Sequence, residues 1–149
     1  MVKKEIDPRM HSAEHILNQT MVAMFGIERC FSAHIEKKKS KCDYHSDRAL
    51  TPEEIEHVEE RVNKVIAADL PVKEHVATRS ESEARFDLDR LPQDMDDAVR
   101  IVEIGDYDAC PCIGPHVSST KEIGLFRIIS TSFEKGVLRI RYKLAAQPQ

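Results

Sequence analysis

The sequence predicts an α+β fold, a two-layer sandwich in which helices pack on one side of a mainly antiparallel sheet. Two segments in the first half place apolar residues at helical spacing, and the C-terminal half contains three segments rich in branched residues. Helices and strands do not alternate regularly, as they would around a parallel sheet. The 149 residues contain no Gly-, Ser- or Pro-rich linker, so we expect a single domain that spans residues 1–149.

A helix followed by a hairpin is expected at the start of the chain. The helix covers residues 8–25, because Asp7 can cap its first turn and Gly26 offers a stop. Apolar and polar residues alternate over 31–35, and the stretch 41–45 can return beside them as a second strand. The hairpin should therefore lie beside the first helix.

A second helix is expected from Thr51 to Asp69. Thr51 and Glu54 have the spacing of a capping box, with a proline between them at the first helical position. Pro71 prevents the helix from continuing. The core-facing stripe of this helix consists of Ile55, Val58, Val62, Val65 and Ile66.

The remaining chain is expected to supply most of the sheet. In its last strand Leu138 and Ile140 face one way, whereas Arg139 and Arg141 face the other. At most a short helix is expected over 81–86, before an exposed, proline-bearing loop over 87–97. The expected strands are residues 72–78, 99–104, 124–129 and 137–144.

Two pairs of metal-binding residue types lie about a hundred residues apart. His11 and His15 are four residues apart on the expected helix, which places both imidazoles on one face. Cys112 and His116 are separated by three residues that include a glycine and a proline, which suit a tight turn. Three imidazoles and one thiolate form a ligand set that zinc accepts and that disfavours magnesium and calcium.

Other interpretations of these residues stay open. Cys110 and Cys112 could be a redox pair, although one residue separates the thiols rather than the usual two. Cys112 and His116 could be a nucleophile and its base, which would leave the two helical histidines unexplained. Four protein ligands are also typical of a closed structural zinc site, whereas turnover requires a free or labile position. If a metal is bound, the three-residue spacing to His116 favours Cys112 over Cys110 as the ligand.

Composition and charge narrow the class of function. The formal net charge of −4 argues against nucleic-acid binding through the overall field, so any RNA contact must be local. The dense cationic run is Lys37, Lys38, Lys39 and Lys41, a pattern that is also typical of a solvated loop.

No stretch is apolar enough for a membrane span or an export signal, so we expect a cytoplasmic protein with reduced thiols and no membrane partner. The sequence contains no Gly-rich motif with a lysine of the kind that binds ATP, so we expect no ATP binding.

The segments around the two half-sites resemble a known family. Residues 11–15 are similar to a His-x-x-x-His helix, and residues 112–116 to a Cys-x-x-x-His element, of AlaX-type trans-editing proteins and of the editing domains of alanyl- and threonyl-tRNA synthetases. Residues 51–69, 99–105, 120–124 and 136–140 are similar to the framework of that family. The family's pattern usually has Gly-Gly-Thr where this chain has Ile113, Gly114 and Pro115, a change that adds bulk and removes a hydroxyl.

The resemblance implies one zinc ion per chain, held by His11, His15, Cys112 and His116, with His11 and His15 acting in metal-assisted catalysis. It also implies hydrolysis of the ester that joins an amino acid to the 3′ end of tRNA, typically serine or glycine wrongly attached to alanine tRNA. Zinc would either activate the water or only hold the amino acid. The alternative function is a non-catalytic, zinc-stabilised module that binds tRNA or an amino acid.

The resemblance extends more weakly to a substrate contact. Asp43 is similar in position to an aspartate of the family's pocket wall, although an exposed loop acid is the competing interpretation. Together with the lysine run, Asp43 completes the set of candidate contacts to aminoacyl-tRNA.

Overall fold

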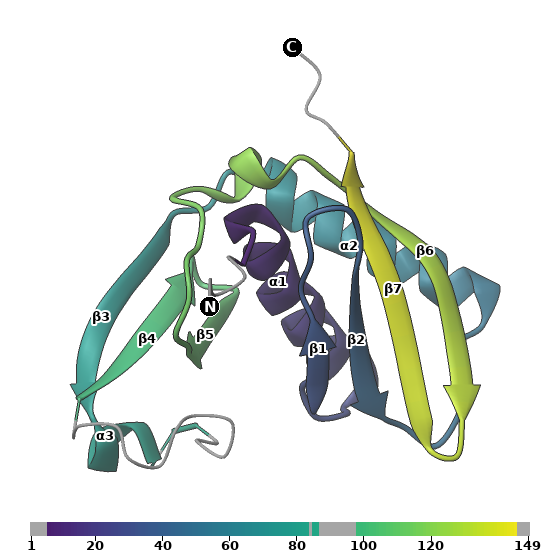
Figure 1. The fold of residues 1–149 in the computed structure, drawn as a ribbon, viewed down its shortest axis with the longest axis horizontal. Helices are drawn as coiled ribbons and strands as arrows, with labels where there is room; N and C mark the ends of the chain where they lie inside the picture. Colours follow the sequence, from purple (N-terminus) through teal and green to yellow (C-terminus); the bar gives the residue numbers. More distant parts are fainter. Residues whose placement is uncertain (1–5, 84, 87–97, 146–149) are drawn as a thin grey trace, which may run out of the picture.

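The computed structural model describes residues 6–83, 85–86 and 98–145. Its strands form two antiparallel sheets, one of four strands in the order β1-β2-β7-β6 and one of three in the order β3-β4-β5 (Figure 1). The predicted α+β class with mainly antiparallel pairing is confirmed, although the strands are divided between two sheets. The helices are α1 (Pro8–Phe25), α2 (Pro52–Ala67), α3 (Arg79–Glu83) and the 3-10 helix η1 (Thr120–Ile123). The strands are β1 (Ser32–His34), β2 (Ser40–His45), β3 (Val72–Thr78), β4 (Ala98–Ile104), β5 (Asp108–Pro111), β6 (Leu125–Glu134) and β7 (Val137–Ala145).

Helix α1 lies between the two sheets (Figure 1). The Asp7 carboxylate accepts hydrogen bonds from the backbone N–H groups of Arg9 and Met10, and Gly26 ends the helix with φ of 66°. Both ends agree with the sequence prediction. Because α1 is covered on most sides, its buried residues include polar side chains that need partners: His11, Ser12, Glu14, His15, Asn18 and Thr20.

Helix α2 and α1 cover the same face of the four-stranded sheet. The predicted capping box is present, with Thr51 and Glu54 each accepting the other's backbone N–H. The Asn63 side chain bonds both the backbone N–H and the carbonyl of Phe126, which fixes α2 against β6. The inward side chains of the strands and the buried residues of both helices form one core cluster. The other face of this sheet carries no helix in the part of the chain that the structure describes.

The three-stranded sheet carries the loop that follows β5. Strand β4 lies in the middle, and the backbone N–H of Cys112 donates to the Arg100 carbonyl at 3.1 Å, so pairing continues past the end of β5. The sequence did not predict β5, and it placed the short helix α3 two residues too late. The expected loop over 87–97 lies outside the described residues. Within the described ranges, no helix has the length and apolar character that a membrane span requires.

Candidate metal centre

Four side chains from the two predicted half-sites meet at the first two turns of α1. One nitrogen of His11, His15 and His116 and the sulfur of Cys112 all lie within 4.8 Å of one another. The Cys112 Sγ is 3.2 Å from the His11 Nε2, and the rings of His11 and His116 stack with centroids 4.1 Å apart. We call these four residues the histidine–cysteine cluster. Cys110 is not among these four residues.

The loop between β5 and η1 is shaped to fit against the helix. Arg100 on β4 donates to the carbonyls of Gly114 at 2.6 Å and Cys112 at 3.3 Å. Gly114 has φ of 135°, and a Cβ at this position would lie 2.8 Å from Cε1 of His11. A glycine is therefore required for two reasons, the backbone conformation and the close approach of an imidazole.

Two of the imidazoles are oriented by hydrogen bonds on Nδ1. His11 Nδ1 donates to the Pro115 carbonyl at 3.0 Å, which leaves the lone pair of Nε2 facing Cys112. His116 Nδ1 shares a hydrogen bond with Ser12 Oγ at 2.9 Å. Its Nε2 is buried and has no hydrogen-bond partner among the described residues. A buried nitrogen of this kind is what a metal ligand presents before the ion binds.

The third imidazole is oriented by a carboxylate from β5. His15 Nδ1 lies 3.6 Å from Oδ2 of Asp108, and Arg29 holds the same carboxylate through two hydrogen bonds of 2.7 and 3.3 Å. Burial alone would raise the pKa of Asp108, but the nearby His15 and the charge and hydrogen bonds of Arg29 outweigh it and lower that pKa. The result is the carboxylate–histidine arrangement that usually supports a metal ligand.

Burial keeps the imidazoles of His11 and His116 neutral at pH 7. Burial is the main reason that the pKa of His11 is lowered, with a further contribution from His15. Burial and then the neighbouring His15 and His11 lower the pKa of His116 to about 2. Neutral imidazole is the form that binds a metal. Three imidazole nitrogens and one sulfur fit zinc, which is four-coordinate with nitrogen and sulfur donors.

A second group of ligand types lies on the other side of α1, and the sequence did not predict it. Glu14, Cys30 and Cys42 place a carboxylate oxygen and two sulfurs within 4.8 Å of one another. The Cys30 thiol donates to Oε2 of Glu14 at 3.4 Å, while Oε1 lies 3.7 Å from the His11 Nε2. We call these three residues the thiol cluster. Glu14 therefore contacts both clusters.

The weaker candidate contacts do not join the metal centre. Lys37, Lys38 and Lys39 are exposed in the turn between β1 and β2, and Lys41 is half-buried on β2. The interpretation of Asp43 as an exposed loop acid was wrong: Asp43 is buried on β2, where Arg139 holds its carboxylate at 2.7 and 2.9 Å. Cross-strand pairing explains this, since Arg139 lies directly opposite on β7.

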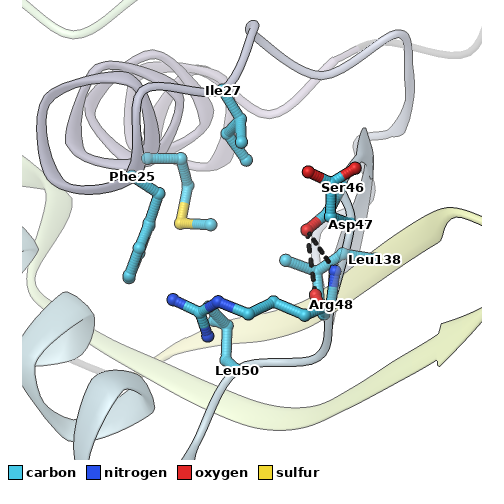
Figure 2. Close-up of a pocket in the computed structure, with 8 residues that line it drawn as sticks. Phe25, Ile27, Ser46, Asp47, Arg48, Leu50 and Leu138 are labelled. Carbon is cyan, nitrogen blue, oxygen red and sulfur yellow. Dashed lines mark hydrogen bonds between the residues drawn. The ribbon is translucent and has the colours of Figure 1, made fainter.

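Two surface hollows differ in their relation to the centre. Figure 2 shows one of about 190 Å³, walled by Phe25, Ile27, Leu138 and Arg48, at the far end of α1 from the cluster. The other, of about 260 Å³, is lined by His116 together with Val117, Ser118 and residues of β3 and β4. Only the second of these two reaches a cluster residue.

Sequence reasoning missed the residues that orient the ligands. Ser12 lies inside the His-x-x-x-His segment, and its spacing alone gave no sign that it would reach His116. Asp108 and Arg100 belong to strands that pack beside the helix only in the folded chain. Strand pairing across long sequence distances, which a single sequence does not reveal, brings them to the centre.

Together, the fold and the cluster define a small α+β domain in which three histidines and one cysteine are placed so that they could hold a metal ion. Residues 99–141 match the family model of the threonyl and alanyl tRNA synthetase second additional domain. An alanine–tRNA ligase of Coxiella burnetii is 36% identical over 126 residues, which is 83% of this chain and 14% of that protein. One from Fervidobacterium nodosum is 33% identical over 141 residues, 93% of this chain and 16% of that protein. The chain thus spans about a seventh of the length of these curated relatives, and its residues 99–141 match the second additional domain of threonyl and alanyl tRNA synthetases.

Proposed function

We propose that the protein hydrolyses wrongly charged aminoacyl-tRNA in trans, in the cytoplasm, with one zinc ion held by the histidine–cysteine cluster. The substrate is the ester that joins serine or glycine to the 3′ end of alanine tRNA. The observation that supports the proposal is the cluster itself together with its outer partners: Nδ1 of His11 and Nδ1 of His116 are hydrogen-bonded to a carbonyl and a hydroxyl, and Nδ1 of His15 faces the Asp108 carboxylate at 3.6 Å. Such partners are typical of histidines that bind a metal ion.

The protein's own groups bind and orient the substrate. When bound, the ion supplies positive charge and Lewis acidity beside the reacting ester. His116 lines the 260 Å³ hollow, so a substrate seated there would place its ester next to the cluster. An aminoacyl ester is already activated, so orientation supplies much of the acceleration.

Selectivity against correctly charged tRNA follows from polar groups in the same hollow. Ser118 and Lys73 line it beside the apolar Val72 and Val102. A site that hydrogen-bonds the serine hydroxyl leaves those groups unpaired when alanine occupies it, which disfavours alanine. Ile113 is exposed and is not among the residues that line this hollow.

The test is hydrolysis of tRNAs charged with serine, glycine, alanine and threonine by the wild type and by Cys112→Ala, with zinc content measured on both. We expect rapid loss of one mischarged species, which disappears together with zinc in the variant. A wild type that holds one zinc per chain and leaves every ester intact would overturn the proposal.

The non-catalytic alternative has one observation in its favour, because four protein donors are typical of structural zinc. Removing the metal with a chelator distinguishes the hydrolase from the non-catalytic module. A structural site contributes folding free energy, so metal removal would unfold the domain. An enzyme whose fold rests on its core would lose activity while keeping its circular dichroism spectrum.

A further inference from the structure

The face of the four-stranded sheet that points away from the helices is basic. Leu138, Ile140 and Tyr142 of β7 point into the core, so the alternate residues of β7 point outward. Strand pairing places further cations on the same face, from β2 and β6. The cations of this face are Lys41, Arg127, Arg139, Arg141 and Lys143, and its acids among the described residues are Asp43 and Glu134.

Four of these cations face one another directly. Lys41 lies opposite Arg141, and Arg127 lies opposite Lys143. Like charges at directly opposite positions destabilise a sheet. Asp43 neutralises Arg139, whereas none of the four cations forms a salt bridge with a described residue. These two repulsive pairs lie side by side in a chain whose net charge is −4. Because they do not stabilise the folded sheet, folding does not explain their presence.

The same cations lie at the end of the sheet nearest the metal centre. Tyr142 donates to the Met10 carbonyl at 3.1 Å, and Arg9 donates to the Ala145 carbonyl at 3.3 Å, so the end of β7 contacts the turn of α1 that bears His11. The turn between β1 and β2 is at this end too, because Ser40 pairs with Tyr142. Figure 1 shows this turn, the end of β7 and the start of α1 together. The turn adds Lys37, Lys38 and Lys39.

We infer that these cations form a docking surface for the phosphodiester backbone of the acceptor arm of tRNA, whose 3′ end then reaches the metal centre. We call Lys41, Arg127, Arg141 and Lys143 the basic face. The inference rests on the proposed function for its substrate. The inference is based on charge complementarity, because cations arranged regularly on strands can pair with the regularly spaced phosphates of RNA. Since the net charge of the protein is negative, RNA should be attracted to this face rather than to the rest of the surface. Such contacts position the RNA without reading its sequence.

The experiment compares two double variants that each remove one arginine and one lysine. Arg127→Gln/Lys143→Gln alters the basic face, and Arg61→Gln/Lys64→Gln alters exposed residues of α2, which packs on the other face of the sheet. Affinity for labelled, uncharged tRNA is measured over a series of salt concentrations. Hydrolysis of seryl-adenosine, which has no acceptor arm, is measured in parallel, and thermal unfolding checks the fold.

We expect the basic-face variant to bind tRNA more weakly and to lower the slope of log affinity against log salt by about 2, one for each lost phosphate contact. Its hydrolysis of seryl-adenosine should match the wild type. Equal affinity and slope in the wild type and in this variant would overturn the inference, as would an equal loss in both double variants. If the basic face binds tRNA and no protein hydrolyses any ester, the docking surface stands and the proposed hydrolysis fails.

Discussion

The two clusters on either side of α1 have the same ligand proximity and different surroundings. In each, the ligand atoms lie within 4.8 Å of one another. In the histidine–cysteine cluster His11 and His116 have outer hydrogen-bond partners and His15 faces Asp108. Cys112 and His116 are half-buried, so an ion and a substrate can reach them. The thiol cluster is sealed in the core: Cys42 is fully buried, and hydrogen bonding to Cys30 and then burial raise the pKa of its thiol well above the ordinary value.

This comparison teaches that proximity alone does not make a metal site. A protonated thiol is a poor ligand, and a sealed one has no path for an ion. In the histidine–cysteine cluster burial keeps His11 and His116 neutral, and the four donor atoms lie close enough to share one ion. We therefore expect the two clusters to respond in opposite ways to the same substitutions.

The largest difference in zinc content should come from replacing one cysteine in each of the two clusters. We expect Cys112→Ser to lose zinc and all esterase activity, whereas Cys42→Ser keeps one zinc per chain, because only the first thiolate is a ligand. Zinc content by mass spectrometry and ester hydrolysis measure both. Loss of zinc from Cys42→Ser, in a protein that remains folded, would show that the thiol cluster binds the ion.

The next largest effect on zinc binding is expected at Gly114, which lies close to the His11 ring. Gly114→Ala should lower zinc affinity roughly tenfold or more, because the new Cβ collides with the His11 ring and the displaced imidazole loses its alignment. Gly26→Ala is the matched control, since Gly26 also has positive φ but has no atom within 4 Å of an added Cβ. That control should lose about 1 to 2 kcal/mol of stability and keep its zinc affinity. Equal zinc affinities in both variants would contradict the collision.

These residues also show how far the sequence could lead. Local signals were sufficient for α1 and α2, whose caps and apolar stripes are written within one segment. Ligand types at helical and turn spacing were sufficient to name His11, His15, Cys112 and His116 as candidates. The division into two sheets, the pairing of Asp43 with Arg139 and the contact of Asp108 with His15 depend on strand register between distant segments, which no local pattern encodes.

A smaller change is expected from the outer partner of His15. Asp108→Asn should lower zinc affinity by about 10- to 100-fold while zinc still binds, because the carboxylate orients the imidazole and raises its basicity. Competition with a chromogenic chelator measures the affinity. Arg29→Gln is a useful companion, since it removes the other partner of the same carboxylate and leaves the contact to His15 in place. Unchanged affinity in Asp108→Asn would mean that Asp108 only anchors Arg29.

The smallest effect concerns the thiol cluster and alkaline pH. Because the folded-state pKa of Cys42 is raised above its unfolded value of 9.0, the protonated thiol contributes stability below pH 9.0 that is lost as pH rises toward the folded pKa. In that window the loss is about 1.4 kcal/mol per pH unit for one such group. Urea unfolding of the wild type and Cys42→Ala at pH 8 and pH 10 measures it. The variant should lose less stability than the wild type over this interval, and an equal loss would mean that Cys42 is not held as a thiol.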